Sequence, residues 1–265
     1  MAHRPRKRFG QHFLHDRGTI ERILQAIDPR SGEILVEIGP GLGALTLPLL
    51  ERVGRLQVIE LDRDLVRELE ARARGRGELA IHSADALRFD FTALAPRAGA
   101  LRIVGNLPYN IASPLLFHLM GQLETIRDMH FMLQREVVER MIAEPGGGEY
   151  GRLSVMLQYR CRIRRLFVVR SGAFRPPPKV DSAFVRLVPR AAPEVPADDE
   201  RWLERLVAQA FSQRRKTLRN ALKGWVTEAA MTAAGVDPGV RPERLTVADY
   251  ARLANASLTS GRRSS

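Results

Sequence analysis

Short apolar runs alternate along much of the chain with stretches in which apolar residues recur every three or four positions. Each run is typical of a buried β-strand, and the stretches between them, such as the one containing Ile20, Ile23 and Leu24, are typical of amphipathic helices. This alternation predicts an α/β fold, in which helices cover both faces of a mostly parallel sheet. The predicted strands are Ile34–Ile38, Leu56–Glu60, Leu79–Ser83, Leu101–Gly105, Met129–Gln134, Arg162–Val169 and Ala183–Val188.

The end of the sheet and the start of a second domain are marked by a change in pattern. Only RSGAFRPPPKVD joins the last two predicted strands, which is too short for a crossover helix, so we expect antiparallel neighbours. A Pro- and Ala-rich stretch then predicts a linker at residues 191–199. Beyond it, apolar residues from Trp202 to Ala210 recur at helical spacing. We therefore predict a main domain over residues 1–190 and a small helical domain over residues 200–265.

Charge adds a first indication of the partner. Lys and Arg number 42 against 30 Asp and Glu, a formal net charge of +12. A strongly basic protein is attracted to nucleic acid, an anionic membrane or acidic partners, although an Arg- and Ala-rich genome also raises the basic content. The single cysteine, Cys161, excludes an intramolecular disulfide and favours the cytoplasm. The histidines have no partners at metal-ligand spacing, so we expect no metal site.

Three successive strand ends carry residues suited to a nucleotide. In ILVEIGPGLGALT, Gly39, Gly41 and Gly43 allow a tight turn and a close approach to a ligand, and the spacing also satisfies the dinucleotide pattern G-x-G-x-x-G/A. Glu60 ends the next strand, where an acid can bind ribose hydroxyls, and Asp85 follows the third, where it can accept the amino group of adenine. A turn without ligand and ordinary helix caps are the alternative interpretations. Together these features favour an adenosine-bearing cofactor.

The segment NLPYN follows the fourth strand and indicates the chemistry. The exocyclic amine of adenine is a poor nucleophile because its lone pair is delocalised, and acceptors for its two hydrogens favour a tetrahedral, reactive nitrogen. We expect these acceptors to be the Asn106 side-chain oxygen and the Leu107 carbonyl. Pro108 would hold the turn rigid and Tyr109 would stack on the base, giving methyl transfer by direct displacement without a metal. An ordinary Asn-Pro turn with a packed Tyr is the alternative.

Seven segments in order resemble the ribosomal RNA adenine N6-dimethyltransferase family, and in particular its bacterial small-subunit branch. They are FGQHFL, EIGPGLGALT, VIELD, ADAL, NLPYNIASPLL, FRPPPKVDSAFVRL and FSQRRKTLRNAL. The resemblance implies a Rossmann-like class I S-adenosylmethionine-dependent methyltransferase sheet with a small C-terminal all-helical domain. It also implies dimethylation of the N6 amines of two adjacent adenosines near the 3′ end of small-subunit ribosomal RNA, during late subunit assembly.

The resemblance further implies which residues bind the cofactor, S-adenosylmethionine. The segment matching GQHFL closes over it within a basic arm and closing segment at residues 1–15, which marks His12 and Leu14. The usual residue of the family at the His12 position is Asn. Gly39 would line the methionine part of the cofactor, with Gly41 in the same loop.

The remaining site residues follow from the same resemblance. Glu60 would hold the ribose and Asp85 the adenine of the cofactor. Asn106 would touch both the methyl donor and the target amine. Phe174, in AFRPPPKV, would form a second aromatic wall facing Tyr109 across the base; a core residue beside a proline turn is the alternative.

Basic residues cluster where RNA would bind. One cluster is the N-terminal arm, a second lies between Arg160 and Arg165, and a third lies in a stretch without acidic residues from Arg205 to Val226. A helix that presents such residues on one face can follow phosphates, and a solvated surface is the alternative. The predicted RNA-binding residues are Arg4, Arg6, Lys7, Arg8, Arg214, Arg215, Lys216, Arg219 and Lys223.

Three other functions remain open at this stage. A methyltransferase of the same chemistry could act on large-subunit RNA. A nucleotide-binding dehydrogenase would explain the glycine loop and Glu60 but gives NLPYN no role. A non-catalytic RNA-binding or ribosome-assembly factor could keep the fold. We expect a cytoplasmic monomer that acts on a pre-mature small ribosomal subunit.

Overall fold

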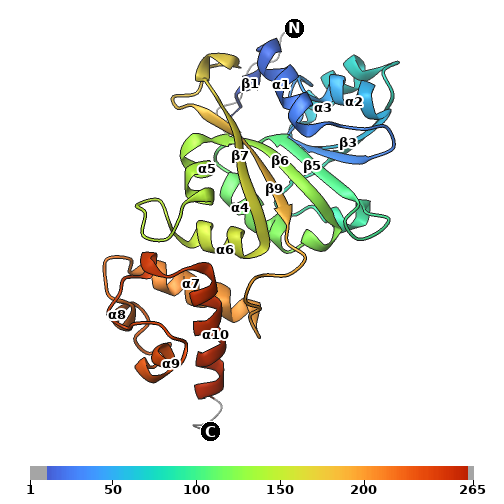
Figure 1. Cartoon of the computed structure of the whole chain (residues 1–265). Helices are drawn as coiled ribbons and strands as arrows, with labels where there is room; N and C mark the ends of the chain where they lie inside the picture. Colours follow the sequence, from blue (N-terminus) through green and yellow to red (C-terminus); the bar gives the residue numbers. More distant parts are fainter. Residues whose placement is uncertain (1–10, 262–265) are drawn as a thin grey trace. The chain divides into compact units, whose positions relative to one another are not determined.

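A seven-stranded sheet forms the centre of the first of two units in this computed structural model, which describes residues 11–261 (Figure 1). The strand order is β4-β3-β2-β5-β6-β9-β7; β2 to β6 pair in parallel and β9 is antiparallel to β6. Every predicted strand is present, and β7 neighbours β9 as expected. The strands are β2 Ile34–Ile38, β3 Arg55–Glu60, β4 Glu78–Ser83, β5 Leu101–Asn106, β6 Ile126–Gln134, β7 Cys161–Val169 and β9 Ser182–Pro189.

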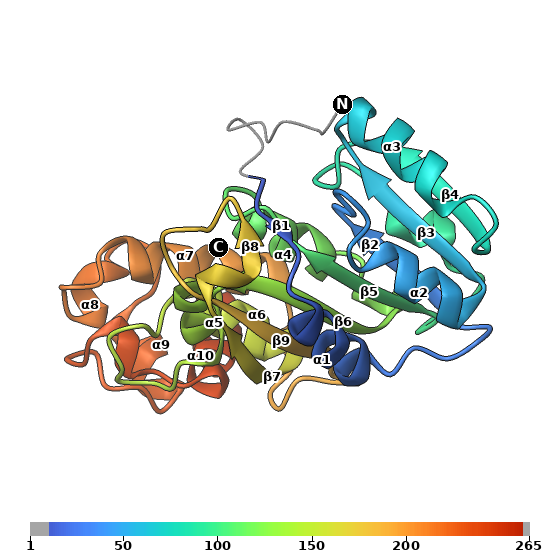
Figure 2. The ribbon, with the colours of Figure 1, turned by 90° about the horizontal axis from the view of Figure 1, so that it is seen from above.

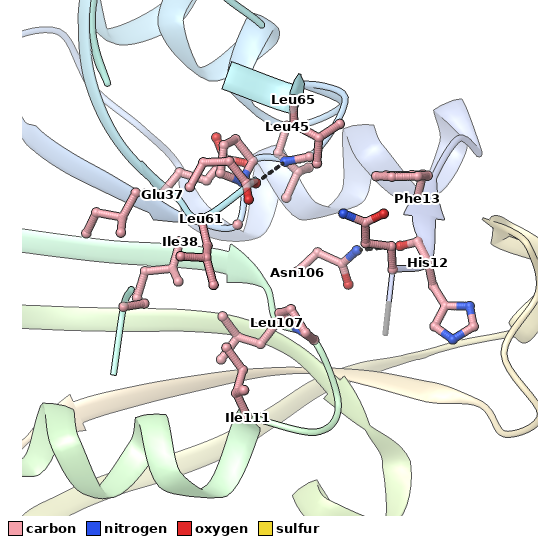
Figure 3. Close-up of a pocket in the computed structure, with 18 of the residues that line it drawn as sticks. His12, Phe13, Glu37, Ile38, Leu45, Leu61, Leu65, Asn106, Leu107 and Ile111 are labelled. Carbon is pink, nitrogen blue, oxygen red and sulfur yellow. Dashed lines mark hydrogen bonds between the residues drawn. The ribbon is translucent and has the colours of Figure 1, made fainter. Parts of the chain in front are cut away.

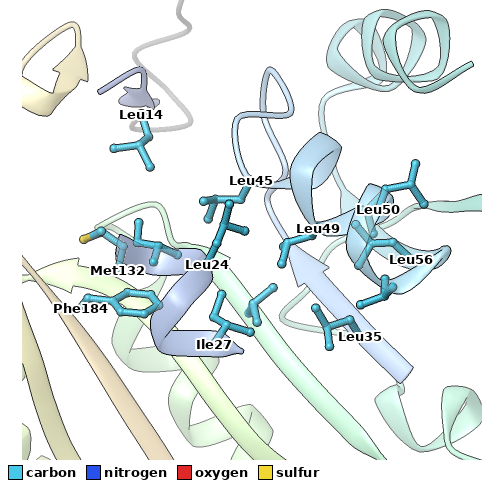
Figure 4. Packing of buried hydrophobic residues seen from close by; sticks show 14 of the residues in the cluster. Leu14, Leu24, Ile27, Leu35, Leu45, Leu49, Leu50, Leu56, Met132 and Phe184 are labelled. Atoms are coloured by element: carbon cyan, nitrogen blue, oxygen red, sulfur yellow. The ribbon is translucent and has the colours of Figure 1, made fainter. Parts of the chain in front are cut away.

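Helices cover the sheet, which confirms the predicted α/β class (Figure 2). Leu24 and Ile27 of α1 and Leu49 of α2 are buried with Leu35 of β2 and Phe184 of β9 in one apolar cluster (Figure 4). This burial is the main favourable contribution to the fold. The helices are α1 Arg17–Ile27, α2 Thr46–Val53, α3 Arg63–Ala73, α4 Ala112–Met120 and α5 Arg135–Ile142, with short 3-10 turns η2 Phe91–Leu94, η3 Leu123–Thr125 and η4 Ser171–Ala173.

A second sheet of two short strands joins segments far apart in the sequence. β1 (Phe13–Leu14) pairs antiparallel with β8 (Phe174–Arg175), so that Leu14 lies opposite Phe174. The backbone amide of His15 extends the pairing with a hydrogen bond to the Ala173 carbonyl. Two-residue strands have no alternation of apolar and polar positions, and the sequence pattern therefore did not predict them.

The second unit is helical, as predicted. The backbone between β9 and α7 contains no helix or strand. Asp199 then starts α7 by accepting a hydrogen bond from the Trp202 amide over 2.9 Å. The helices are α6 Arg152–Arg160, α7 Glu200–Ser212, α8 Leu218–Ala221, α9 Glu228–Ala233 and α10 Val247–Gly261, with η5 at Pro242–Arg244. No helix within residues 11–261 is long and apolar enough to cross a membrane.

The expected domain boundary needs one correction. Glu139–Arg162 belongs to the second unit, although it precedes the linker and falls within the predicted main domain at residues 1–190. The reason is packing: α6 contacts α7 and α10. The Tyr159 hydroxyl accepts a hydrogen bond from the Ala197 amide over 2.9 Å, and Arg160 pairs with Glu200 at 2.6 Å. Contacts between distant segments leave no mark on local composition.

Candidate active site

One cavity of about 250 Å³ lies where the parallel strands end (Figure 3). In open α/β sheets this edge is where ligands bind. The cavity brings together ten residues predicted from the sequence, namely His12, Leu14, Gly39, Gly41, Glu60, Asp85, Asn106, Leu107, Pro108 and Tyr109. The described part of the chain contains no cluster of His, Cys, Asp or Glu that could hold a metal ion.

The glycine loop after β2 forms one wall of the cavity. Gly41 has a φ of 56°, in the left-handed region that favours glycine. A Cβ at this position would lie 3.2 Å from the Phe13 ring of the N-terminal segment. A side chain here would therefore strain the backbone and crowd the N-terminal segment that lines the cavity.

Glu60 lies at the end of β3, beside the glycine loop. Its side chain accepts hydrogen bonds from the amides of Asp62, over 2.8 Å, and Gly41, over 3.4 Å. Burial raises the pKa of Glu60, and these amides oppose the rise. Asp62, and not Glu60, caps α3. The buried position of Glu60 at the cavity is suited to binding a polar group of a ligand, such as a ribose diol.

Asp85 forms the next part of the wall, in the turn after β4. It is half-buried, and its Oδ1 accepts a hydrogen bond from the Leu87 amide over 3.0 Å. The carboxylate thus stabilises its own turn while it lines the cavity. Much of the remaining lining is apolar, including Ile38, Leu65 and Leu87, which suits an aromatic ring held between side chains.

Glu37 is a cavity residue that the sequence analysis missed. It lies in β2 and is only 2% exposed. Burial raises its pKa to about 8, and the nearby charge of Glu60 adds to the rise. Among residues 11–261 its Oε2 has no hydrogen-bond partner. The available signal was an acid inside the apolar strand ILVEI, since a charged residue in a buried strand is often functional.

The NLPY segment adjoins the N-terminal segment at the mouth of the cavity. The Asn106 side-chain amide donates a hydrogen bond to the His12 carbonyl over 3.0 Å. The Leu107 amide donates to the Met132 carbonyl of β6 over 3.2 Å, which anchors the turn to the sheet. The Tyr109 hydroxyl lies 2.7 Å from the buried Ser182 hydroxyl. Burial raises the pKa of Tyr109, so its ring is neutral at physiological pH.

Phe174 lies in the apolar core in this structure and not on the cavity wall. It is 1% exposed. The aromatic neighbour of Tyr109 is instead His12, whose ring stacks on it with centroids 5.5 Å apart. The backbone pairing of β8 with β1 accounts for this position, because it turns Phe174 toward the core beside Leu14.

The predicted RNA-binding residues fall into two groups. Arg4, Arg6, Lys7 and Arg8 lie outside the described residues. The other five do not share one helix face, because α7 ends at Ser212 and a turn separates it from the short α8. Arg214, Arg215 and Lys216 lie in that turn, Arg219 in α8 and Lys223 in the next turn.

These five residues still present positive charge on the second unit. Arg215, Lys216, Arg219 and Lys223 are exposed. Arg214 is half-buried and donates a hydrogen bond to the Gly147 carbonyl over 3.1 Å. Arg219 also pairs with Glu228 at 3.7 Å. The exposed cations around α8 are suited to contacting phosphates.

Comparison with known proteins identifies the family. The ribosomal RNA adenine dimethylase family matches residues 2–258. A ribosomal RNA small subunit methyltransferase A from Nitrosococcus oceani is 58% identical over 253 residues, covering 96% of each chain. A protein of the same name from Pseudomonas aeruginosa is also 58% identical, over 96% of this chain and 94% of its own. These similarities give no support to the dehydrogenase alternative.

Solved structures agree with this result. A dimethyladenosine transferase from Plasmodium falciparum has a TM-score of 0.78 at 26% identity, covering 96% of this chain and 98% of its own. The 23S ribosomal RNA methyltransferase ErmE has a TM-score of 0.70 at 28% identity, covering 92% and 99%. The resemblance seen in the sequence motifs is thus confirmed, and the chain belongs to the ribosomal RNA adenine dimethylase family.

Proposed function

We propose that this chain transfers methyl groups from S-adenosylmethionine to the N6 amines of two adjacent adenosines near the 3′ end of small-subunit ribosomal RNA, giving N6,N6-dimethyladenosine. The observation that carries the proposal is the Asn106 amide at the mouth of the cavity, held by the His12 carbonyl. The names of the relatives, small subunit methyltransferases, support the choice of subunit.

The residues around the cavity suit the cofactor. Glu60 and Asp85 supply carboxylates at two neighbouring strand ends, and the glycine loop allows close approach of the backbone. We assign Glu60 to the ribose, Asp85 to the adenine, and Gly39, Gly41 and Leu14 to the methionine side. The bound cofactor supplies a methyl group on a positively charged sulfur, which is already a strong electrophile.

The NLPY segment prepares the nucleophile. The Asn106 nitrogen is engaged by the His12 carbonyl, so its Oδ1 is the atom that accepts a hydrogen from the target amine. The Leu107 carbonyl is the second acceptor. Pro108 stiffens this turn, and Tyr109 stacks on the base once it leaves its helix. The protein thus contributes positioning and preorganised acceptors to a direct displacement.

The reaction also involves residues outside the cavity. The exposed cations around α8, together with the basic residues 4–8, bind ribosomal RNA phosphates. The enzyme acts as a cytoplasmic monomer on a pre-mature small subunit. Residues outside the cavity recognise the subunit, while the cavity selects adenine.

Transfer of labelled methyl groups to isolated ribosomal subunits that lack adenine dimethylation tests the proposal. We expect label in dimethyladenosine on the small subunit, and none when Asn106→Ala replaces the wild type. Label on the large subunit alone would assign the chain to the ErmE type of activity, which the TM-score of 0.70 makes the second candidate. Subunit binding without any label would instead indicate a non-catalytic assembly factor.

A further inference from the structure

The His12 side chain is directed toward Tyr109 and not toward the cofactor side of the cavity. Its ring stacks on Tyr109 with an interplanar angle of 28°. Its Nδ1 lies 2.7 Å from the Pro176 carbonyl. In Figure 3 the His12 ring lies beyond Asn106, on the side away from Glu37 and Ile38.

Three distant segments meet at this residue. The His12 main chain accepts the hydrogen bond from Asn106, and its side chain contacts Tyr109 and Pro176. Because a carbonyl only accepts, His12 Nδ1 carries the hydrogen and donates it to Pro176. His12 therefore links three parts of the site. They are Asn106, which accepts a hydrogen from the target amine, Tyr109, on which the base stacks, and the FRPPPK segment.

We propose that His12 is a positioning residue for the target adenine and not a side-chain ligand of the cofactor. Ring centroids 5.5 Å apart are in direct contact, which leaves no room for a base between His12 and Tyr109. The adenine therefore stacks on the other face of Tyr109, and His12 supports that ring from behind. The hydroxyl contact with Ser182 holds the far end of the same ring. This inference rests on the proposed adenine methylation.

The usual Asn of the family cannot provide this support. An amide is shorter than an imidazole and has no ring to stack on Tyr109. His12→Asn therefore removes the stacking contact, whereas His12→Phe keeps an aromatic ring and removes only the hydrogen bond to Pro176. His15→Asn, an exposed position of the same segment, is the matched control.

The test measures the KM for small subunits and the dissociation constant of the cofactor in all variants. We expect His12→Asn to raise the KM on the order of three- to tenfold, as for loss of an aromatic contact, with cofactor affinity unchanged within about twofold. His12→Phe should stay closer to the wild type, and His15→Asn should match it. A subunit RNA with 2-aminopurine at the target position reports stacking directly, and its fluorescence should be less quenched with His12→Asn.

Two results would overturn the inference. One is weaker cofactor binding by His12→Asn with an unchanged KM for subunits, which would make the side chain a cofactor ligand. The other is wild-type behaviour of both His12 variants in every assay, which would leave the ring without a role. Failure of the proposed function is seen separately, because the wild type itself would then methylate adenine on neither subunit. Melting temperatures confirm that each variant is folded.

Discussion

The side-chain amide of Asn106 donates its hydrogen bond to the backbone carbonyl of His12 over 3.0 Å. This contact fixes the orientation of the amide, with its nitrogen toward the His12 carbonyl, because only the nitrogen can donate to a carbonyl. It also joins the end of β5 to the N-terminal segment that lines the cavity. The position of the N-terminal segment and the orientation of the Asn106 amide are therefore coupled through one side chain.

Asn106→Asp should abolish methyl transfer while changing almost no volume. The new carboxylate would place an acceptor against the His12 carbonyl, and the two oxygens would repel. We expect kcat to fall by about 100-fold or more, as for loss of a preorganised polar contact in a transition state. Methyl transfer to small subunits at saturating cofactor measures the effect.

Gln25→Glu makes the same amide-to-carboxylate change on the exposed face of α1 and should leave kcat unchanged. An Asn106→Asp enzyme with wild-type kcat would show that the amide nitrogen has no part in setting the site. Weaker cofactor binding in Asn106→Asp alone would show that the contact with His12 closes the cavity as well.

Glu37 should make the folded protein less stable as the pH rises. Its pKa is about 8 in the fold against an ordinary value of 4.5, so between these values the native state holds a proton that the unfolded state has lost. The contribution of protonated Glu37 to the free energy of unfolding is then fully present below about pH 4.5. It decreases toward pH 8, by on the order of 5 kcal/mol at most. Glu37→Gln should remove this dependence. Urea unfolding of wild type and variant at pH 5 and pH 8 measures it.

The difference between the two proteins isolates Glu37 from other groups. Burial lowers the pKa of His130 to about 4, which has the opposite effect on stability below its ordinary value of 6.5. This contribution is the same in wild type and variant and cancels in the subtraction. Parallel pH profiles for the two proteins would mean that Glu37 is ionised in the fold.

Gly105 lies in β5 directly before Asn106 and packs closely against the end of β2. A Cβ added there would lie 2.6 Å from the Ile38 carbonyl and 2.9 Å from the Leu107 side chain. Gly105→Ala should therefore push β5 from β2 and displace Asn106. We expect a loss of about 1–3 kcal/mol in unfolding free energy, together with reduced methyl transfer. Gly172→Ala is the control, because a Cβ there meets nothing within 4 Å. Equal stability of both variants would show that the strands absorb the added methyl.

Most of the cavity wall at the strand ends could be predicted from the sequence. Gly39, Glu60, Asp85 and Asn106 lie at or just beyond the ends of successive strands, and the carboxyl ends of parallel strands share one edge of the sheet. Knowing the strands was therefore enough to place these residues together. Motif resemblance then supplied the chemistry that geometry alone leaves open.

The part of the structure around His12, Tyr109 and Phe174 could not be predicted in the same way. The contact of His12 with Tyr109 and Pro176 depends on three segments that meet only in three dimensions. The two-residue strands that bring them together carry no periodic pattern. The buried position of Phe174 depends on the same pairing, so its sequence context alone predicted a different neighbour for Tyr109.

The exposed cations around α8 should set the salt dependence of RNA binding. Arg215, Lys216, Arg219 and Lys223 are exposed, and each that contacts a phosphate releases counterions on binding. Replacing Lys216 and Lys223 together by Gln should weaken subunit binding and reduce the slope of log K against log salt by about one per lost contact. Binding titrations between low and moderate salt measure both values.

Arg74→Gln, which removes an exposed charge after α3, should leave the slope unchanged. A double variant with the wild-type slope would show that RNA follows another surface.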